Sequence, residues 1–166
     1  MHHPHSRRSA RALAAALALA PFISAACNSR YSAARVTGIP DDPAVKWGPA
    51  PAVFPPGAQL AVLQGNPSAS GPFIIRLRLP DGYVIPPHTH PTDENVTVLA
   101  GTFRVGMGRT FDEASLVAVA PGGFVTAPAL HEHYAKAQGV TTVQVDAVGP
   151  FAITYVNPGD VPQAAR

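Results

Sequence analysis

Apolar and polar residues alternate along much of the chain. In the segment FIIRLRL, residues 73–79, Ile75 and Leu77 alternate with Arg76 and Arg78. Because successive side chains of a β-strand point to opposite faces of a sheet, this spacing predicts a strand with one apolar and one basic face. The pattern favours a sheet that presents its apolar face to a core.

A second strand near the C-terminal end shows the same alternation. Val143 and Val145 fall on one face, and Gln144 and Asp146 fall on the other. The polar faces of the two strands supply four candidates for contact with a small molecule: Arg76, Arg78, Gln144 and Asp146. They would line a ligand cavity if these faces point inward. The alternative for the arginines is contact with solvent or with a second subunit.

Short segments separated by glycine and proline make up the rest of the pattern. No stretch of 12 residues after the N-terminal region keeps a helical period, and 19 prolines and 14 glycines are spread along the chain. About nine or ten short strands are expected, including a hairpin in which residues 95–101 and 102–108 turn back at Gly101. Strands at this spacing are typical of a sandwich or barrel, so the predicted fold class is all-β.

Residues 1–27 have the order of regions found in export signals. A basic front with three arginines precedes an apolar run over residues 12–23, and small residues follow at 24–26. The run is too short to span a bilayer, which takes about 20 apolar residues. The sequence therefore predicts a leader and a location outside the cytoplasm, against the alternative of a buried helix.

The only cysteine, Cys27, ends the segment ISAAC, which resembles a bacterial lipobox. One interpretation is a lipoprotein attached to a membrane through a lipidated Cys27, and the other is simple cleavage with a soluble periplasmic product. The pair Arg7-Arg8 suits twin-arginine export, and a Sec signal fits as well. A single cysteine excludes a disulfide within one chain.

Charge limits the partners. Three of the 12 Lys and Arg residues precede Cys27 and none of the 10 Asp and Glu residues does, so nine basic and ten acidic residues remain after it. No basic patch carries interleaved aromatic residues. Nucleic acid is therefore not expected as a partner.

Residues 28–57 are rich in proline, alanine and serine, which predicts a tether and an extended arm before a domain over residues 58–166. Trp47 and Phe54 in the arm are expected to dock on the domain or on a second subunit. A homodimer is the expected assembly, because the arm needs an apolar partner and exposed sheet edges favour pairing.

Four histidines follow the leader and form two H-x-H pairs, His88 with His90 and His131 with His133. In a strand, residues i and i+2 share a face about 6.6 Å apart, so two imidazoles can approach one ion. Glu94 follows a turn and adds a carboxylate oxygen. Such a ligand set suits Fe, Mn, Ni, Cu or Zn. The alternative is a set of histidines that only make hydrogen bonds.

The spacing around the first pair resembles the first motif of the cupin superfamily, G-x5-H-x-H-x3–4-E-x6-G. The chain meets every position, from Gly82 to Gly101. It looks most like small single-domain bacterial cupins that carry an H-x-H-P-T-D-E run and close with GPFAITYVNP. The resemblance to that group implies no particular reaction.

The segment GGFVTAPALHEHYAKA resembles the second cupin motif, G-x5-P-x-G-x2-H-x3-N. Two positions depart from it, because Leu130 stands where glycine is usual and Ala137 where asparagine is. The spacing places His133 at the ligand position, with His131 as the alternative.

The resemblance covers about residues 58–158 and implies a double-stranded antiparallel β-barrel, the cupin or jelly-roll fold, with one divalent metal inside. The implied metal ligands are His88, His90, Glu94 and His133. Three residues adjoin these ligands and are expected to point away from the metal: Asp93, Glu132 and Tyr134.

A shell of three imidazoles and one carboxylate would leave two of six octahedral positions open. This suits a metal-dependent oxygenase, or an isomerase or lyase, acting on a small organic molecule; redox chemistry would exclude Zn, which keeps one valence. The alternative function is a non-catalytic cupin that binds or senses a small molecule. Six apolar residues are expected in the cavity wall: Ile75, Leu77, Val96, Val98, Phe103 and Val143.

Overall fold

The computed structural model describes residues 42–163 of the 166-residue chain. This part consists of β-strands and three 3-10 helices of three residues each, which confirms the all-β fold class. The strands are β1 (Gly48–Pro49), β2 (Gln59–Gln64), β3 (Gly71–Leu79), β4 (Val84–Thr89), β5 (Glu94–Met107), β6 (Val117–Val119), β7 (Phe124–Ala127), β8 (His133–Gly149) and β9 (Thr154–Tyr155). The short helices are η1 (Asp42–Ala44), η2 (Glu113–Ser115) and η3 (Pro158–Asp160).

The expected export signal and Cys27 lie outside the described residues. Among residues 42–163, no helix is both long and apolar enough to cross a membrane.

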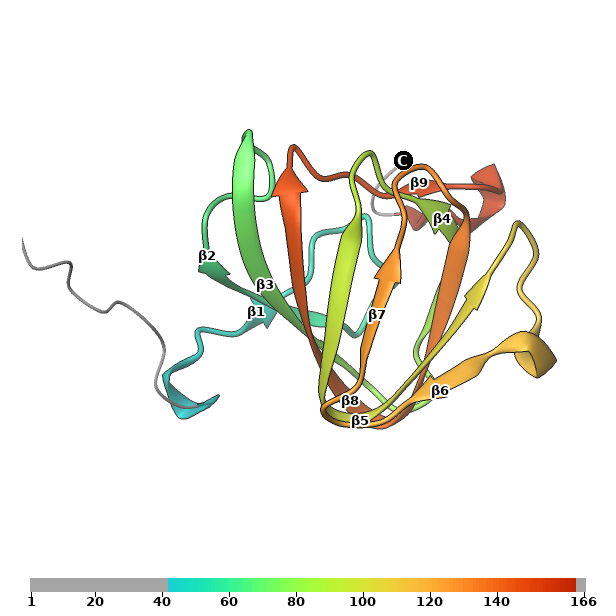
Figure 1. Cartoon of the computed structure of the whole chain (residues 1–166), viewed down its shortest axis with the longest axis horizontal. Coiled ribbons are helices and arrows are strands. Elements are labelled where there is room, and N and C mark those ends of the chain that lie inside the picture. Colours follow the sequence, from blue (N-terminus) through green and yellow to red (C-terminus); the bar gives the residue numbers. More distant parts are fainter. Residues whose placement is uncertain (1–41, 164–166) are drawn as a thin grey trace, which may run out of the picture. The chain divides into compact units, whose positions relative to one another are not determined.

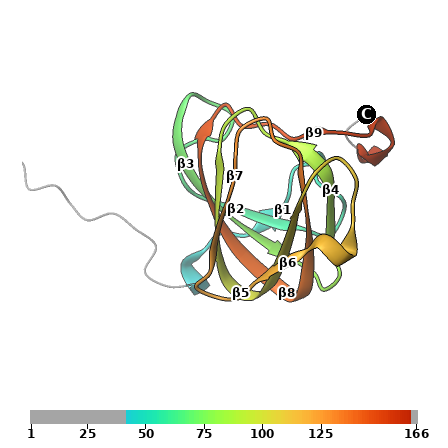
Figure 2. The same cartoon turned by 45° about the vertical axis from the view of Figure 1, so that its right-hand side comes forward.

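The two longest strands, β5 and β8, connect the walls of a curled antiparallel sheet (Figures 1 and 2). They pair with each other from Glu94 opposite Ala147 to Met107 opposite His133. One half of β8 also pairs with β3 and the other half with β4, while β5 pairs with β7 near its start and with β6 near its end. The sheet therefore folds over on itself and encloses the apolar face.

The expected hairpin at Gly101 is wrong, because β5 runs through this residue as one bent strand. The pairing of β5 with β8 shifts register on either side of Ala100. Gly101 has a positive φ of 73°, and a Cβ atom there would lie 2.5 Å from the carbonyl oxygen of Val140. Glycine thus permits a bend and a close backbone approach, which a sequence pattern does not distinguish from a turn.

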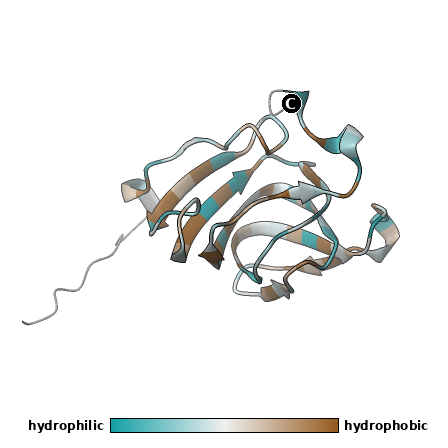
Figure 3. Ribbon diagram, turned by 90° about the horizontal axis from the view of Figure 1, so that it is seen from above, coloured by the Kyte–Doolittle hydropathy of each residue, from teal (hydrophilic) through white to brown (hydrophobic). Residues whose placement is uncertain are grey.

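The core lies on the inner face of the sheet. Hydrophobic and hydrophilic residues alternate along the strands, which Figure 3 shows as bands of brown and teal. In β3, Ile75, Leu77 and Leu79 are at most 4% exposed. The alternation predicted for this strand is confirmed, and its apolar face is the one that faces inward.

The last part of the arm, residues 47–57, contacts its own barrel. Its strand β1 pairs with β2, and Phe54 packs against the core. The hydroxyl of Tyr155 donates a hydrogen bond of 2.8 Å to the carbonyl of Val53. Trp47 lies with its ring centroid 4.2 Å from the guanidinium carbon of Arg78. Of the two docking partners expected for the arm, the domain is the one in contact; the homodimer remains a prediction.

Candidate metal centre

Three strands bring the predicted ligands together at one end of the barrel interior. His88 lies in β4 and His90 directly follows this strand, Glu94 begins β5, and His133 begins β8. His88 and His133 are opposite each other in the β4–β8 pairing. Because residues of one register pair share a face, two segments 45 positions apart in sequence place their imidazoles side by side.

The ligand atoms of this group are close together. Nε2 of His88 lies 3.1 Å from Nε2 of His90, and one ligand nitrogen from each of the three histidines lies within 4.8 Å of the others. Oε2 of Glu94 is 3.7 Å from Nε2 of His90 and 3.5 Å from Nε2 of His133. Two nitrogens that bind one ion at about 2.1 Å and at right angles lie about 3 Å apart, so the spacing fits a shared metal ion.

Backbone carbonyls fix the orientation of all three imidazoles. Nδ1 of His88 lies 2.7 Å from the carbonyl of Pro86, Nδ1 of His90 lies 2.7 Å from that of Ala152, and Nδ1 of His133 lies 3.0 Å from that of His131. A carbonyl only accepts, so each neutral ring carries its proton on Nδ1 and directs the Nε2 lone pair inward. Metal-binding histidines are commonly held by such second contacts.

Burial without a hydrogen bond also points to a metal at His133. Each of the three histidines is 3% exposed, and Nε2 of His133 is buried without a hydrogen-bond partner. A buried polar atom without a partner costs free energy unless another interaction replaces water. The three histidines could therefore bind a metal ion.

The interior also controls protonation. Burial and the neighbouring His133 and His90 lower the pKa of His88 to about 3, and burial lowers the pKa of His90. Burial alone would lower the pKa of His133, but the carboxylate of Glu94 raises it above its usual value. Burial alone would raise the pKa of Glu94, but His133 and His90 lower it. His88 and His90 are thus neutral near pH 7, as metal ligation requires.

The structure distinguishes the two histidines of the second pair. His131 is exposed and its Nδ1 lies 3.0 Å from the carbonyl of Ala129, whereas His133 is buried beside His88. Leu130, which directly precedes His131, adopts a φ of 62°, the left-handed conformation that suits the glycine of the motif. Leu130 therefore occupies a backbone conformation that glycine would adopt with less strain.

The three residues beside the ligands make contacts away from the centre. Asp93 accepts a 2.7 Å hydrogen bond from the backbone of Ala129, and Glu132 forms an ion pair with Arg109. Tyr134 is 1% exposed, and its ring centroid lies 5.1 Å from that of Phe111. This is the outward placement expected from strand geometry.

The four polar strand residues do not line the cavity, which corrects the expectation of ligand contact. Their positions alternate with inward residues such as Ile75 and Val145, so their side chains lie on the outer face. Nε of Arg76 is 3.4 Å from Oε1 of Gln144, and Nε2 of Gln144 is 3.3 Å from Oδ2 of Asp146. Arg78 lies over the Trp47 ring instead.

A cavity of about 550 Å³ contains the histidine cluster. Five of the six expected wall residues line it, and Val98 packs elsewhere in the core. Among the residues that line this cavity, His88, His90, Glu94 and His133 are the titratable ones. The loop residues Asn66 and Ser68 also line it and are exposed, so the cavity reaches the surface there.

Sequence reasoning missed two contributors to this site. The ring of Phe151 stacks on His90 with centroids 4.2 Å apart and an interplanar angle of 18°. Phe54, from the arm, lines the cavity directly. Phe151 belongs to the GPFAITYVNP segment quoted for the family resemblance, which was therefore a signal; nothing in the arm's composition separates a cavity wall from a surface contact.

No protein-family profile matches the chain, and no curated protein matches its sequence significantly. Solved structures do resemble it. A candidate acetylacetone dioxygenase from Methylibium petroleiphilum PM1 is 20% identical, with a TM-score of 0.57, over 78% of this chain and 88% of that one. A cupin 2 conserved barrel domain protein from Rhodopseudomonas palustris is 18% identical, with a TM-score of 0.54, over 70% of this chain and 80% of that one. The polyketide cyclase RemF from Streptomyces resistomycificus is 19% identical, with a TM-score of 0.53, over 71% and 84%.

At these identities the likeness concerns the fold. It agrees with the curled antiparallel sheet that the strand pairings describe. The chain has the fold of the cupin superfamily.

Proposed function

We propose that this barrel is a metal-dependent enzyme of the oxygenase type that acts on a small, largely apolar molecule with an oxygen donor. One observation carries the proposal: three carbonyl-oriented imidazoles and a carboxylate converge inside an otherwise apolar cavity of about 550 Å³. A pocket of this size with few polar groups suits a small organic ligand.

In this proposal, the polar and apolar residues of the cavity have different roles. His88, His90 and His133 would hold the metal through Nε2, with Glu94 as an anionic fourth ligand. A bound Fe, Mn, Ni or Cu ion would supply Lewis-acid and redox chemistry there. Val96, together with the other apolar wall residues, keeps bulk water away from the reacting atoms.

The identity of the titratable groups favours oxygenase chemistry over the isomerase and lyase alternatives. Proton abstraction by an isomerase or lyase needs a side chain that can accept a proton beside the substrate. The four titratable residues that line the described cavity are the same four that would bind the metal. Oxygenase chemistry uses the metal and an external oxidant. It therefore does not need a further proton-accepting side chain among the other residues that line the cavity.

The test is oxygen consumption by Fe-loaded and Mn-loaded protein with a panel of catechols, flavonols and diketones. The proposal expects uptake with at least one compound, lost in His88→Ala and retained in His131→Ala, whose side chain is exposed. If every compound fails, and a ligand bound at micromolar affinity is recovered unchanged, the non-catalytic binding function is the better description.

We also propose that the protein acts after export, as a periplasmic or membrane-anchored form. The support is the basic and apolar order of residues 1–27. Fractionation should find the chain outside the cytoplasm without its leader, and cytosolic protein that starts at Met1 would contradict this. Incorporation of a fatty-acid analogue that is lost in Cys27→Ala would identify the lipoprotein form.

A further inference from the structure

The arm is a wall one chain thick between two hollows. Pro51 and Val53 line the metal-centred cavity, while Ala50 and Ala52 line a second hollow of about 660 Å³ on the other side. Residues 52–53 form a turn, and neighbouring residues of this turn border different hollows. Phe54 is the one described residue that lines both hollows.

Hydrogen bonds on both sides of Phe54 hold it in place. Its backbone nitrogen donates to the carbonyl of Pro51 at 2.9 Å. The hydroxyl of Tyr155 donates to the carbonyl of Val53 at 2.8 Å, and the hydroxyl of Tyr83 donates to the carbonyl of Pro55. Burial raises the pKa of Tyr155 to about 12, so this hydroxyl remains a donor at neutral pH. The aromatic ring therefore belongs to a fixed partition and not to a loose strand.

Both hollows are mainly apolar around this partition. On the far side the wall consists mostly of prolines and alanines of the arm together with Pro162, with Gln163 as its polar member, and on the near side Leu60 and Val62 face the same cavity as Phe54. A hydrocarbon group that enters the metal-centred cavity can bury its methylenes until it meets the partition. Beyond Phe54 lies the second, mainly apolar hollow.

We propose that Phe54 determines the ligand length that the metal-centred cavity accepts, and that a smaller side chain at this position joins the two hollows into one elongated site for a hydrocarbon tail. The inference rests on the proposed function only in that the ligand occupies this cavity. The expected substrates are therefore compact molecules with a short apolar part.

The test measures binding of n-alkanols from butanol to dodecanol to the zinc-loaded chain by titration calorimetry. Zinc keeps one valence, and all probes share one head group, so affinity differences report chain length. Each buried methylene should raise affinity about fourfold until the cavity is full, after which affinity stays constant. In Phe54→Ala the increase should continue to longer chains, so that the longest alkanols bind at least about tenfold tighter than they bind to the unmodified chain.

Two further variants make the result interpretable. Phe124→Ala removes the same ring from a position that is 61% exposed and borders neither hollow, and it should leave the length limit unchanged. Phe54→Leu keeps an apolar side chain in the wall and should shift the limit less than alanine, which preserves the test if the alanine variant does not fold.

An identical length limit in all variants would overturn the inference, and so would an equal loss of affinity at every chain length. Oxygen uptake tests the proposed function separately. Oxygen uptake together with an unchanged length limit would contradict only the proposed role of Phe54. A changed length limit without oxygen uptake would contradict only the proposed oxygenase function.

Discussion

Two groups of ionisable side chains in this protein have similar residue types and different surroundings. In the inner cluster, Glu94 lies among His88, His90 and His133, and its side chain is 14% exposed. In the outer cluster, Glu113 lies between Arg104 and Lys136, and its side chain is 55% exposed. Each group is a carboxylate surrounded by nitrogen donors, one inside the barrel and the other on its surface.

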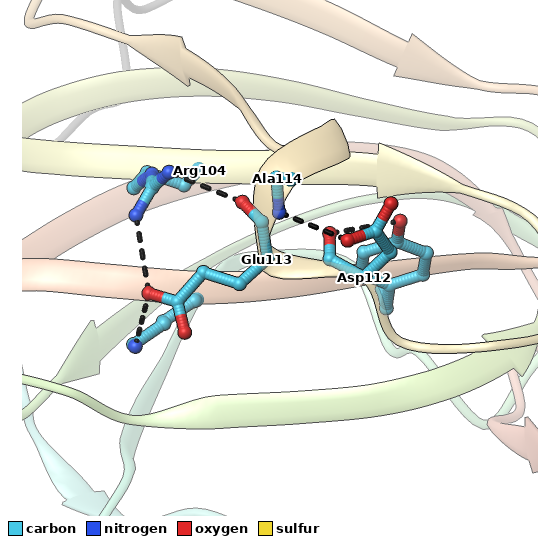
Figure 4. Close-up of polar contacts among 6 residues, drawn as sticks. Arg104, Asp112, Glu113 and Ala114 are labelled. Carbon is cyan, nitrogen blue, oxygen red and sulfur yellow. Dashed lines mark hydrogen bonds and ion pairs between the residues drawn. The ribbon is translucent and has the colours of Figure 1, made fainter.

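The outer cluster has the closer ion pair. Nζ of Lys136 lies 2.6 Å from Oε1 of Glu113, and Arg104 contacts both the carboxylate and the backbone carbonyl of Glu113 (Figure 4). The hydrogen bond from Lys136 lowers the pKa of Glu113. Water nevertheless competes for every member of this group and salt screens it, so good geometry at a surface contributes little to stability.

Inside the barrel, longer distances have larger consequences. No contact of Glu94 with a histidine is shorter than 3.5 Å among the ion pairs described. Burial, followed by His133 and His90, nevertheless lowers the pKa of His88 to about 3, although Glu94 acts in the opposite direction. Burial reduces contact with water, so neighbouring groups have a larger share in stabilising each protonation state. The comparison shows that burial, more than distance, decides which polar group can carry function.

The largest expected effect is loss of metal from variants of the inner cluster. His88→Ala or His133→Ala should weaken binding of a divalent metal by more than about 100-fold, because even the loss of a residue that only supports a ligand costs 10- to 100-fold. Elemental analysis and calorimetric titration measure this effect. His131→Ala is the control and should bind metal as the unmodified chain does. If His131→Ala empties the site while His133→Ala keeps it full, the ligand assignment is wrong.

A smaller effect is expected from pH. Glu94 raises the pKa of His133, so this histidine holds a proton at a pH at which an ordinary histidine has lost it. Metal and proton compete for its Nε2. Metal affinity should therefore rise with pH up to the pKa of His133, and fall by up to about tenfold per pH unit below it. In Glu94→Gln the start of this decline should move to lower pH. An unchanged profile in that variant would show that the carboxylate does not control the proton on His133.

A modest gain in stability is expected from Leu130→Gly. This variant tests how much backbone strain lies at Leu130, beside the segment that carries His133. Leu130 is 71% exposed and has a φ of 62°, so glycine removes a backbone cost of about 1–2 kcal/mol and loses little packing. Greater freedom of the unfolded chain offsets part of this gain. The net gain should be up to about 1 kcal/mol in urea unfolding, with no gain in Leu130→Ala. A loss of stability would mean that the leucine makes contacts worth more than the strain.

The smallest effect is expected from the outer cluster. Glu113→Gln should leave metal affinity unchanged and lower the melting temperature only slightly, and the difference should shrink further in high salt. Melting curves at low and high ionic strength measure it. A loss as large as that caused by Glu94→Gln would refute the conclusion that burial separates the two clusters.

Local patterns made much of the fold and the site predictable. Alternation separated Ile75 and Leu77 from Arg76 and Arg78 and favoured the apolar pair as the inner one, which their burial confirms. Motif spacing favoured His88, His90 and His133, with His131 as the alternative to His133, and the favoured three are the histidines that cluster. These features depend on a few neighbouring residues, and a sequence shows such neighbours directly.

The remaining features depend on partners that are distant in sequence. The carbonyl of Ala152 orients His90 from 62 positions away, and every residue type has a backbone carbonyl, so no residue pattern marks this contact. Phe54 lines the cavity because of how the arm docks, which its own composition does not reveal. The course of β5 through Gly101 follows from its pairing with β8, whereas the local glycine suggests a turn.

The long pairings of β8 also have a kinetic consequence. In the folded chain Gly149 is opposite Gly71 and Ala147 is opposite Glu94, so these contacts close large loops and must form slowly. His133 reaches His88 only when β8 has joined β4, and a complete set of metal ligands is therefore a late product of folding. A metal bound to that set stabilises interactions absent from the earlier transition state. It should prolong the lifetime of the folded chain much more than it accelerates folding.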